Sequence, residues 1–129
     1  MRELLLEALK KLDRAIEATV LDDGWPDPEK IDQIGLHLQT LLELGDLVPS
    51  PLQETYRQLV ESLSRETRLG LDCLALQRRW YDAGEGEMWE LYAQMALRSA
   101  VASRDLKERL HILSVGAEHY ARPREGLAA

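Results

Sequence analysis

The sequence predicts an all-α fold, a compact bundle of four to five helices around one long central helix at about residues 50–82. Apolar residues recur every three or four positions along most of the chain, as they do on the buried side of a helix. Leucine dominates the apolar residues and phenylalanine is absent, while β-branched residues, which favour strands, are few. Glycine and proline gather in short stretches that separate the periodic segments.

The central helix has a well-marked start and apolar residues on more than one side. Ser50-Pro51-Leu52-Gln53 matches a capping box with proline at the first helical position, so we expect the Ser50 side chain to accept a hydrogen bond from the Gln53 amide. In the second half of the helix, a second apolar stripe consists of Leu69, Cys73, Leu76 and Trp80. The pattern predicts that other helices surround this second half, and that Gly70 marks a close helix crossing.

Two shorter helices are expected before the central one. The apolar stripe of the first, at about residues 2–21, consists of Leu5, Leu9, Leu12, Ile16 and Val20. The stripe of the second, between the N-cap residue Asp27 and a C-cap at Gly45, consists of Ile31, Ile34, Leu38, Leu41 and Leu42. We expect Trp25, between the two, to plug the end of the core. Only about five residues link the second helix to the central one, which favours antiparallel neighbours.

The chain after the Gly84-Glu85-Gly86 break predicts either two helices or one. A helix at about residues 87–102 and another at 104–120 would be separated by a cap at Ser103, or the two would form one continuous helix. A stripe of small residues that favours close approach to the central helix near Gly70 consists of Ala93, Ala96, Ala100 and Ser103. The inner face of the last segment is expected to consist of Leu106, Leu110, Leu113, Ala117 and Tyr120.

The length of 129 residues suits one domain, which we place at residues 1–122, followed by a short flexible tail at residues 123–129 after the helix stop Pro123. The formal net charge is −7, and most of it lies in the first 50 residues. An acidic surface repels phosphate backbones, so nucleic acid is an unlikely partner. No apolar run approaches the ~20 residues that cross a bilayer, so we expect no membrane association.

Cysteine usage and the N-terminal residues favour a cytoplasmic protein. A single cysteine allows no internal disulfide, and the N-terminus lacks the pattern of a signal peptide. Because Cys73 falls on an apolar helix face, we expect it to be a small buried residue and not a nucleophile. The sequence contains no metal-ligand spacing and no glycine-rich phosphate loop, and it predicts no cofactor and no metal.

One pair of residues suggests catalysis. Six residues separate Arg104 from His111, and the polar Asp105 follows the arginine. This spacing resembles the Arg-x(4–6)-His signature of HEPN-type helical ribonucleases. The resemblance implies that a dimer brings two such pairs around a scissile phosphate, with His111 as general acid or base and Arg104 as phosphate ligand. It gives the alternative function of a ribonuclease or toxin-antitoxin component, whereas the plain interpretation is two solvated charges on a helix.

The surplus of apolar helix surface favours a different function, a non-enzymatic protein-interaction module such as an adaptor, a chaperone-like protein or a small subunit of a larger assembly. Its general build resembles that of small helical chaperones of bacterial flagellar or type III export. The expected partner-binding residues are Trp80, Tyr81, Met88, Trp89, Tyr92 and Met95. The partner would be another protein or a second copy of the chain, bound through this apolar helix face.

Overall fold

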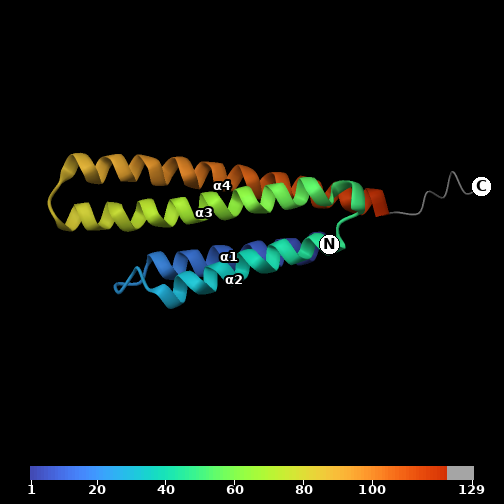
Figure 1. The fold of residues 1–129 in the computed structure, drawn as a ribbon, viewed down its shortest axis with the longest axis horizontal. Helices are drawn as coiled ribbons and strands as arrows, with labels where there is room; N and C mark the ends of the chain where they lie inside the picture. Colours follow the sequence, from blue (N-terminus) through green and yellow to red (C-terminus); the bar gives the residue numbers. More distant parts are fainter. Residues whose placement is uncertain (122–129) are drawn as a thin grey trace, which may run out of the picture.

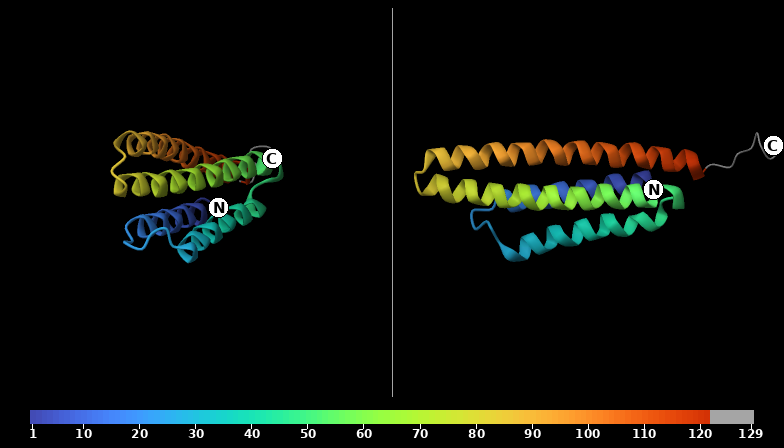
Figure 2. Two further views of the ribbon diagram at one scale, coloured as in Figure 1. Left: turned by 60° about the vertical axis from the view of Figure 1, so that its left-hand side comes forward. Right: turned by 45° about the horizontal axis from the view of Figure 1, so that its top comes forward.

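Four helices form an antiparallel bundle in a computed structural model of the chain, which describes residues 1–121 (Figure 1). They are α1 (Arg2–Val20), α2 (Pro28–Glu43), α3 (Ser50–Asp82) and α4 (Gly86–Ala121), with a short 3₁₀ helix, η1 (Leu44–Leu47), after α2. Each α-helix runs antiparallel to the one before it, as the views in Figures 1 and 2 agree. The predicted all-α bundle is confirmed; the expected tail at residues 123–129 lies outside the described residues.

The helix α3 has the predicted bounds but not the predicted cap. Pro49 occupies the N-cap position in an extended conformation, and no side chain caps the helix. Ser50 already lies inside the helix, so its hydroxyl is one position too late to act as the N-cap acceptor. The side-chain amide nitrogen of Gln53, Nε2, instead donates to the Val48 carbonyl at 3.0 Å. The expected capping box was wrong because the helix begins one residue earlier than that motif requires.

The first two helices follow the sequence pattern closely. The Asp27 carboxylate accepts a hydrogen bond from the Glu29 amide at 3.0 Å, which confirms Asp27 as the N-cap of α2. Trp25 is 5% exposed and belongs to the core, as expected of a plug. Two details differ: Ile31 is exposed, and Gly45 lies within η1 instead of capping α2, because the chain tightens into a 3₁₀ turn after Glu43.

The main core lies where all four helices overlap. Its fully buried side chains include Leu5, Leu12, Ile34, Leu41, Tyr56, Val60, Leu63 and Leu110. The Tyr56 hydroxyl donates to the Leu41 carbonyl at 2.5 Å, which joins α3 to the end of α2. Burial raises the pKa of Tyr56 to about 12, so this phenol stays a hydrogen-bond donor at neutral pH.

The second half of α3 is not surrounded by helices, which corrects the expectation from its apolar residues. The helices α3 and α4 contain 33 and 36 residues, whereas α1 and α2 contain only 19 and 16. At 1.5 Å per residue the long pair reaches about 50 Å and the short pair about 25–30 Å. The long pair therefore extends past the α1–α2 connection as a two-helix segment (Figure 1). We call residues 69–101 the extended hairpin; Leu71 still belongs to the main core, and only the end of the hairpin, beyond the contact of Arg78 with Asp22 and Asp23, lies past that connection.

A single helix, α4, replaces the two helices that a cap at Ser103 would have separated. Serine is tolerated within a helix, and no glycine or proline near Ser103 interrupts the hydrogen bonding. The inner face predicted for its last turns is confirmed except at Tyr120, which is exposed. The small stripe does meet α3 near Gly70: a Cβ added at Gly70 would lie 3.0 Å from the Ser99 hydroxyl oxygen, and this hydroxyl donates to the Glu66 carbonyl.

The turn between α3 and α4 is closed by backbone hydrogen bonds that stop α3 sharply. The Gly84 amide donates to the Tyr81 carbonyl at 3.1 Å and the Glu85 amide to the Trp80 carbonyl at 3.0 Å. Gly84 has a φ of +74°, a left-handed conformation that glycine adopts without a steric penalty. This pattern is a Schellman motif, and it reverses the chain within three residues.

Two glycines inside helices, Gly70 and Gly35, predict opposite mutational effects. Gly70→Leu should lower the free energy of unfolding by about 1–3 kcal/mol, because the side chain would push α4 away at Ser99. Gly35→Leu is the matched control, since a Cβ at Gly35 meets no atom within 4 Å. It should be neutral or stabilising by up to about 1 kcal/mol. Urea titrations followed by circular dichroism measure both; equal losses would contradict the close crossing.

The Tyr56 phenol predicts a loss of stability at high pH. Its pKa is about 12 in the folded chain and 10.0 without burial, so the folded state binds this proton more tightly. The stabilisation is therefore complete below pH 10 and is lost as the pH rises from 10 to about 12. Tyr56→Phe should remove this pH dependence and, at pH 7, cost about 1 kcal/mol for the missing hydrogen bond. Unfolding curves between pH 7 and 11 test this, with the exposed Tyr81→Phe as control.

Candidate functional site

All six residues that the sequence predicted as a partner-binding site lie on the extended hairpin. Trp80 and Tyr81 belong to the last turns of α3, and Met88, Trp89, Tyr92 and Met95 belong to the first turns of α4. Tyr81 is 67% exposed and Met95 is 36% exposed, while the other four are half-buried. The structure thus brings the six to one end of the molecule, but it divides them between two sides of the hairpin.

The side of α3 that is turned toward α1 and α2 is marked by Arg78. Its guanidinium donates to the carbonyl oxygens of Asp22 and Asp23 at 3.2 and 2.9 Å, which docks the α1–α2 connection on α3. Leu76 and Trp80 are each two residues away from Arg78, about 160° around the helix at 100° per residue. They therefore lie on the side of α3 that is turned away from α1 and α2.

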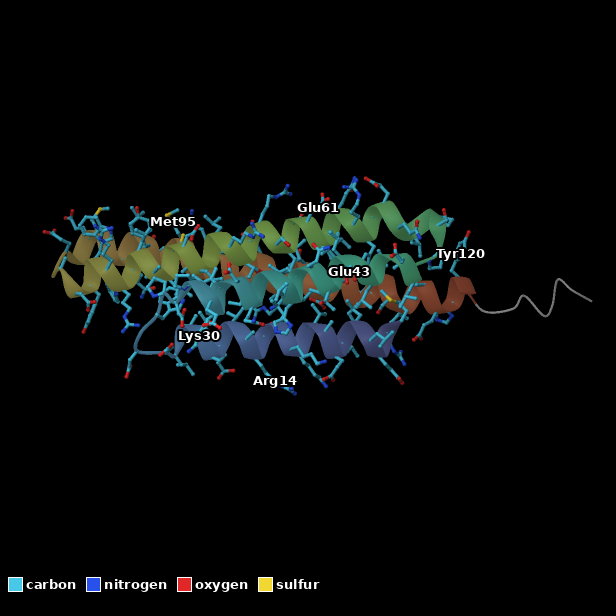
Figure 3. All side chains as sticks on the ribbon, turned by 60° about the horizontal axis from the view of Figure 1, so that its bottom comes forward. Arg14, Lys30, Glu43, Glu61, Met95 and Tyr120 are labelled. Atoms are coloured by element: carbon cyan, nitrogen blue, oxygen red, sulfur yellow. The ribbon has the colours of Figure 1, made fainter. Side chains whose placement is uncertain are left out.

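The same reasoning applies to α4, where Lys107 pairs with Asp13 of α1. Leu91 lies about 160° and Met95 about 120° around α4 from Lys107. Figure 3 shows Met95 at the edge of the molecule opposite Arg14 of α1. We call this side of the extended hairpin the outer face; its apolar residues are Leu69, Cys73, Leu76, Trp80, Met88, Leu91 and Met95.

The outer face is apolar and partly open to solvent. Leu69 and Leu91 are 46% and 47% exposed, while Leu76, Trp80 and Met88 are half-buried. None of the seven residues of the outer face belongs to the main core or packs against it within residues 1–121. Leu69 and Leu91 are not among the six predicted residues, although their spacing of three and four from other apolar residues of the same helix is visible in the sequence.

The opposite side of the hairpin carries the aromatic pair Tyr81 and Trp89. Their ring centroids are 6.0 Å apart and the ring planes are inclined at 51°. Together with Trp25 and Val20 they line a shallow hollow of about 340 Å³. A groove of about 340 Å³ continues from Val20 and Leu74 along the small residues of the α3–α4 contact. The indole nitrogens of Trp25 and Trp80 are buried and have no hydrogen-bond partner among the described residues.

Arg104 and His111 lie two turns apart on α4, about 10 Å along the helix axis. Arg104 is exposed, while His111 is half-buried and its Nδ1 atom is buried without a partner in the described structure. Both share the side of α4 that carries Lys107, which pairs with α1. They do not lie on the outer face. Each described chain contributes one such pair, so the chemistry of the HEPN-type resemblance would require a second chain.

Other reactive groups form no further constellation. Cys73 is buried, and burial raises the pKa of its thiol, with a smaller contribution from the negative charge of Asp72, so the thiol stays protonated at neutral pH. Within the described part of the chain, no three histidine, cysteine or acidic side chains are placed to hold a metal ion together. Among these residues, too, no helix combines the length and apolar composition that spanning a bilayer requires.

The α1–α2 connection carries a carboxylate whose pKa is lowered, Asp22. A hydrogen bond from Lys30 is the main cause that lowers the pKa of Asp22, and the Gly24 amide also donates to it, at 3.1 Å. These contacts shape the connection that Arg78 holds against α3. Arg78 is therefore structural, whereas its neighbour Arg79 is exposed and belongs to no ion pair within the described residues.

Comparisons of the chain with protein-family models, with curated proteins and with solved structures found no match.

The docking role of Arg78 predicts a selective loss of stability. Arg78→Ala should lower the free energy of unfolding by about 1–2 kcal/mol, because two carbonyl groups lose a charged donor. It should also increase protease cleavage between residues 21 and 27, since the connection is no longer held on α3. Arg68→Ala, an exposed arginine of the same helix, is the control and should change stability by less than about 0.5 kcal/mol. Equal effects of both variants would refute this role.

Proposed function

We propose that this protein is a non-enzymatic protein-interaction module, an adaptor, chaperone-like protein or small subunit of a larger assembly, that binds its partner through the outer face. The observation that supports this most directly is the exposure of Leu69, Leu91 and Met95 on the side of α3 and α4 that is turned away from α1 and α2. In a four-helix bundle each helix packs against two neighbours. In the end of the extended hairpin each helix packs against only one.

The types of residue on this surface also favour a role in binding a partner. It combines half-buried Trp80 and Met88 with the more exposed Leu69, Leu91 and Met95, all on one side of two adjacent helices. Tryptophan and methionine are enriched in the cores of protein interfaces, and methionine adapts to the shape of a partner. Several exposed apolar residues on one side of a small domain mark an interaction site more often than an isolated exposed leucine does.

The proposal predicts that charge on the outer face abolishes binding without unfolding the chain. The double variant Leu91→Arg with Met95→Arg should lose most of the fluorescence enhancement of an apolar dye such as ANS and should lose any bound partner. Both side chains are exposed, so its unfolding midpoint should stay near that of the parent chain. Leu36→Arg, an exposed leucine of α2, is the matched control and should bind normally.

Measurements of solution mass and of co-purifying proteins complete the test. An assembly heavier than the 14.7 kDa chain that disappears in the double variant would support the proposal. If the parent chain is a strict 14.7 kDa monomer, without a partner and without bound dye, the interaction function is refuted.

A further inference from the structure

We propose that the partner on the outer face is a second copy of this chain, packed outer face to outer face around a two-fold axis parallel to the helices. This inference rests on the proposed function and names the partner of the same site. The two extended hairpins would then form a four-helix bundle, in which each helix gains a neighbour on its outer face. Every contact would occur twice, because such an interface is isologous.

The direction of the axis decides which helices meet. An axis parallel to the helices places α3 of one chain on α4 of the other, with both turns at Gly84 at the same end. Because α3 and α4 run antiparallel within one chain, α3 also runs antiparallel to α4 of the second copy. We call the position of a residue along the bundle axis its height. Residues that lie at the same height within one chain therefore also lie at the same height across the interface.

The heights are set by the contact between Gly70 and Ser99 and by the ring pair of Tyr81 and Trp89. Each step forward along α3 from Gly70 corresponds to one step back along α4 from Ser99. By this count Asp72 and Arg98 lie at the same height to within one residue. Arg98 is about 180° around α4 from Lys107, and Asp72 is about 120° around α3 from Arg78, so both charges lie on or beside the outer face.

Charged residues on and beside this face are complementary at three heights. Along α3 they follow a seven-residue spacing and are Arg65, Asp72 and Arg79. At the corresponding heights, α4 carries Asp105, Arg98 and Glu87. The first two pairs agree within one residue, whereas Glu87 lies three to four residues, about one helical turn, from the height of Arg79. Positive, negative and positive charges on α3 thus face negative, positive and negative charges on α4, the arrangement by which charges flanking an apolar seam select a partner.

Most of these charges have no ion pair in one chain. Asp72, Arg79, Glu87 and Arg98 form none among the described residues, whereas Asp105 pairs with Arg109 of its own helix at 3.0 Å. Because that pair is exposed, its exchange for Arg65 of the second copy costs little. The complementarity therefore supports a second copy of this chain, not an unrelated apolar helix, as the occupant of the outer face.

A charge exchange between Asp72 and Arg98 tests the inference. Asp72→Arg alone places an arginine at position 72 against Arg98 of the other copy, at both symmetry-related contacts. Arg98→Asp alone places an aspartate at position 98 against Asp72 of the other copy, again at both contacts. Each variant alone should dimerise about tenfold more weakly than the parent chain. An equimolar mixture of the two should form a heterodimer of near-parental affinity, since both of its pairs are opposite charges. Sedimentation equilibrium at low ionic strength measures these constants, and Asp32→Arg, an exposed charge of α2, is the control.

The possible results distinguish a failure of the proposed dimer from a failure of the proposed interaction function. Recovery in the mixture of Asp72→Arg with Arg98→Asp supports the proposed dimer. If dimer affinity recovers only when Asp72→Arg is mixed with Arg79→Asp, then α3 of one copy packs on α3 of the other. That result would overturn the proposed arrangement. A third result would overturn the second copy but leave the interaction function. In that result the chain stays monomeric at every concentration, another protein binds it, and the Leu91→Arg, Met95→Arg variant abolishes that binding. Circular dichroism of each variant checks that the bundle is folded.

Discussion

The difference in length between the two helix pairs is the constraint on which the rest of this structure depends. Where α1 and α2 cover the long pair, fully buried leucines together with Tyr56 form one core. Beyond the α1–α2 connection, the same two helices continue without cover. A helix buries an apolar side only against another element, so the uncovered length leaves apolar side chains in contact with water. The fold thus separates a half with a continuous buried core from a half whose apolar side chains are partly exposed.

The extended hairpin remains ordered because its two helices approach closely. Gly70 lies against Ser99, and the Ser99 hydroxyl donates to the Glu66 carbonyl. Small residues at such a seam bring two backbones near each other and increase the dispersion contacts of the side chains beside them. At the far end, the Schellman motif at Gly84 joins the helices with little freedom. At its base, Arg78 ties α3 to the α1–α2 connection, which limits how far the hairpin can bend away from the bundle.

The outer face lies on this closely packed helix pair and has charged residues on and beside it. A preorganised surface loses little conformational entropy on binding, which favours affinity. In the proposed dimer, its apolar residues would supply the area for association, and the alternating charges on and beside it would supply the selection between partners. The other candidate pair, Arg104 with His111, lies on the side of α4 adjacent to α1, so a dimer formed through the outer face would not bring two such pairs together.

The sequence by itself determined the helices and much of their packing sides, because these depend on local periodicity and on caps such as Asp27 and the break at Gly84. It also indicated the close crossing at Gly70 and the buried positions of Trp25 and Cys73. It could not determine whether Ser103 interrupts α4, since one serine is compatible with either conformation. Only the tertiary structure decided that the apolar second half of α3 is open instead of surrounded. Periodicity shows that a side of a helix is apolar, whereas what covers it depends on how far the neighbouring helices reach.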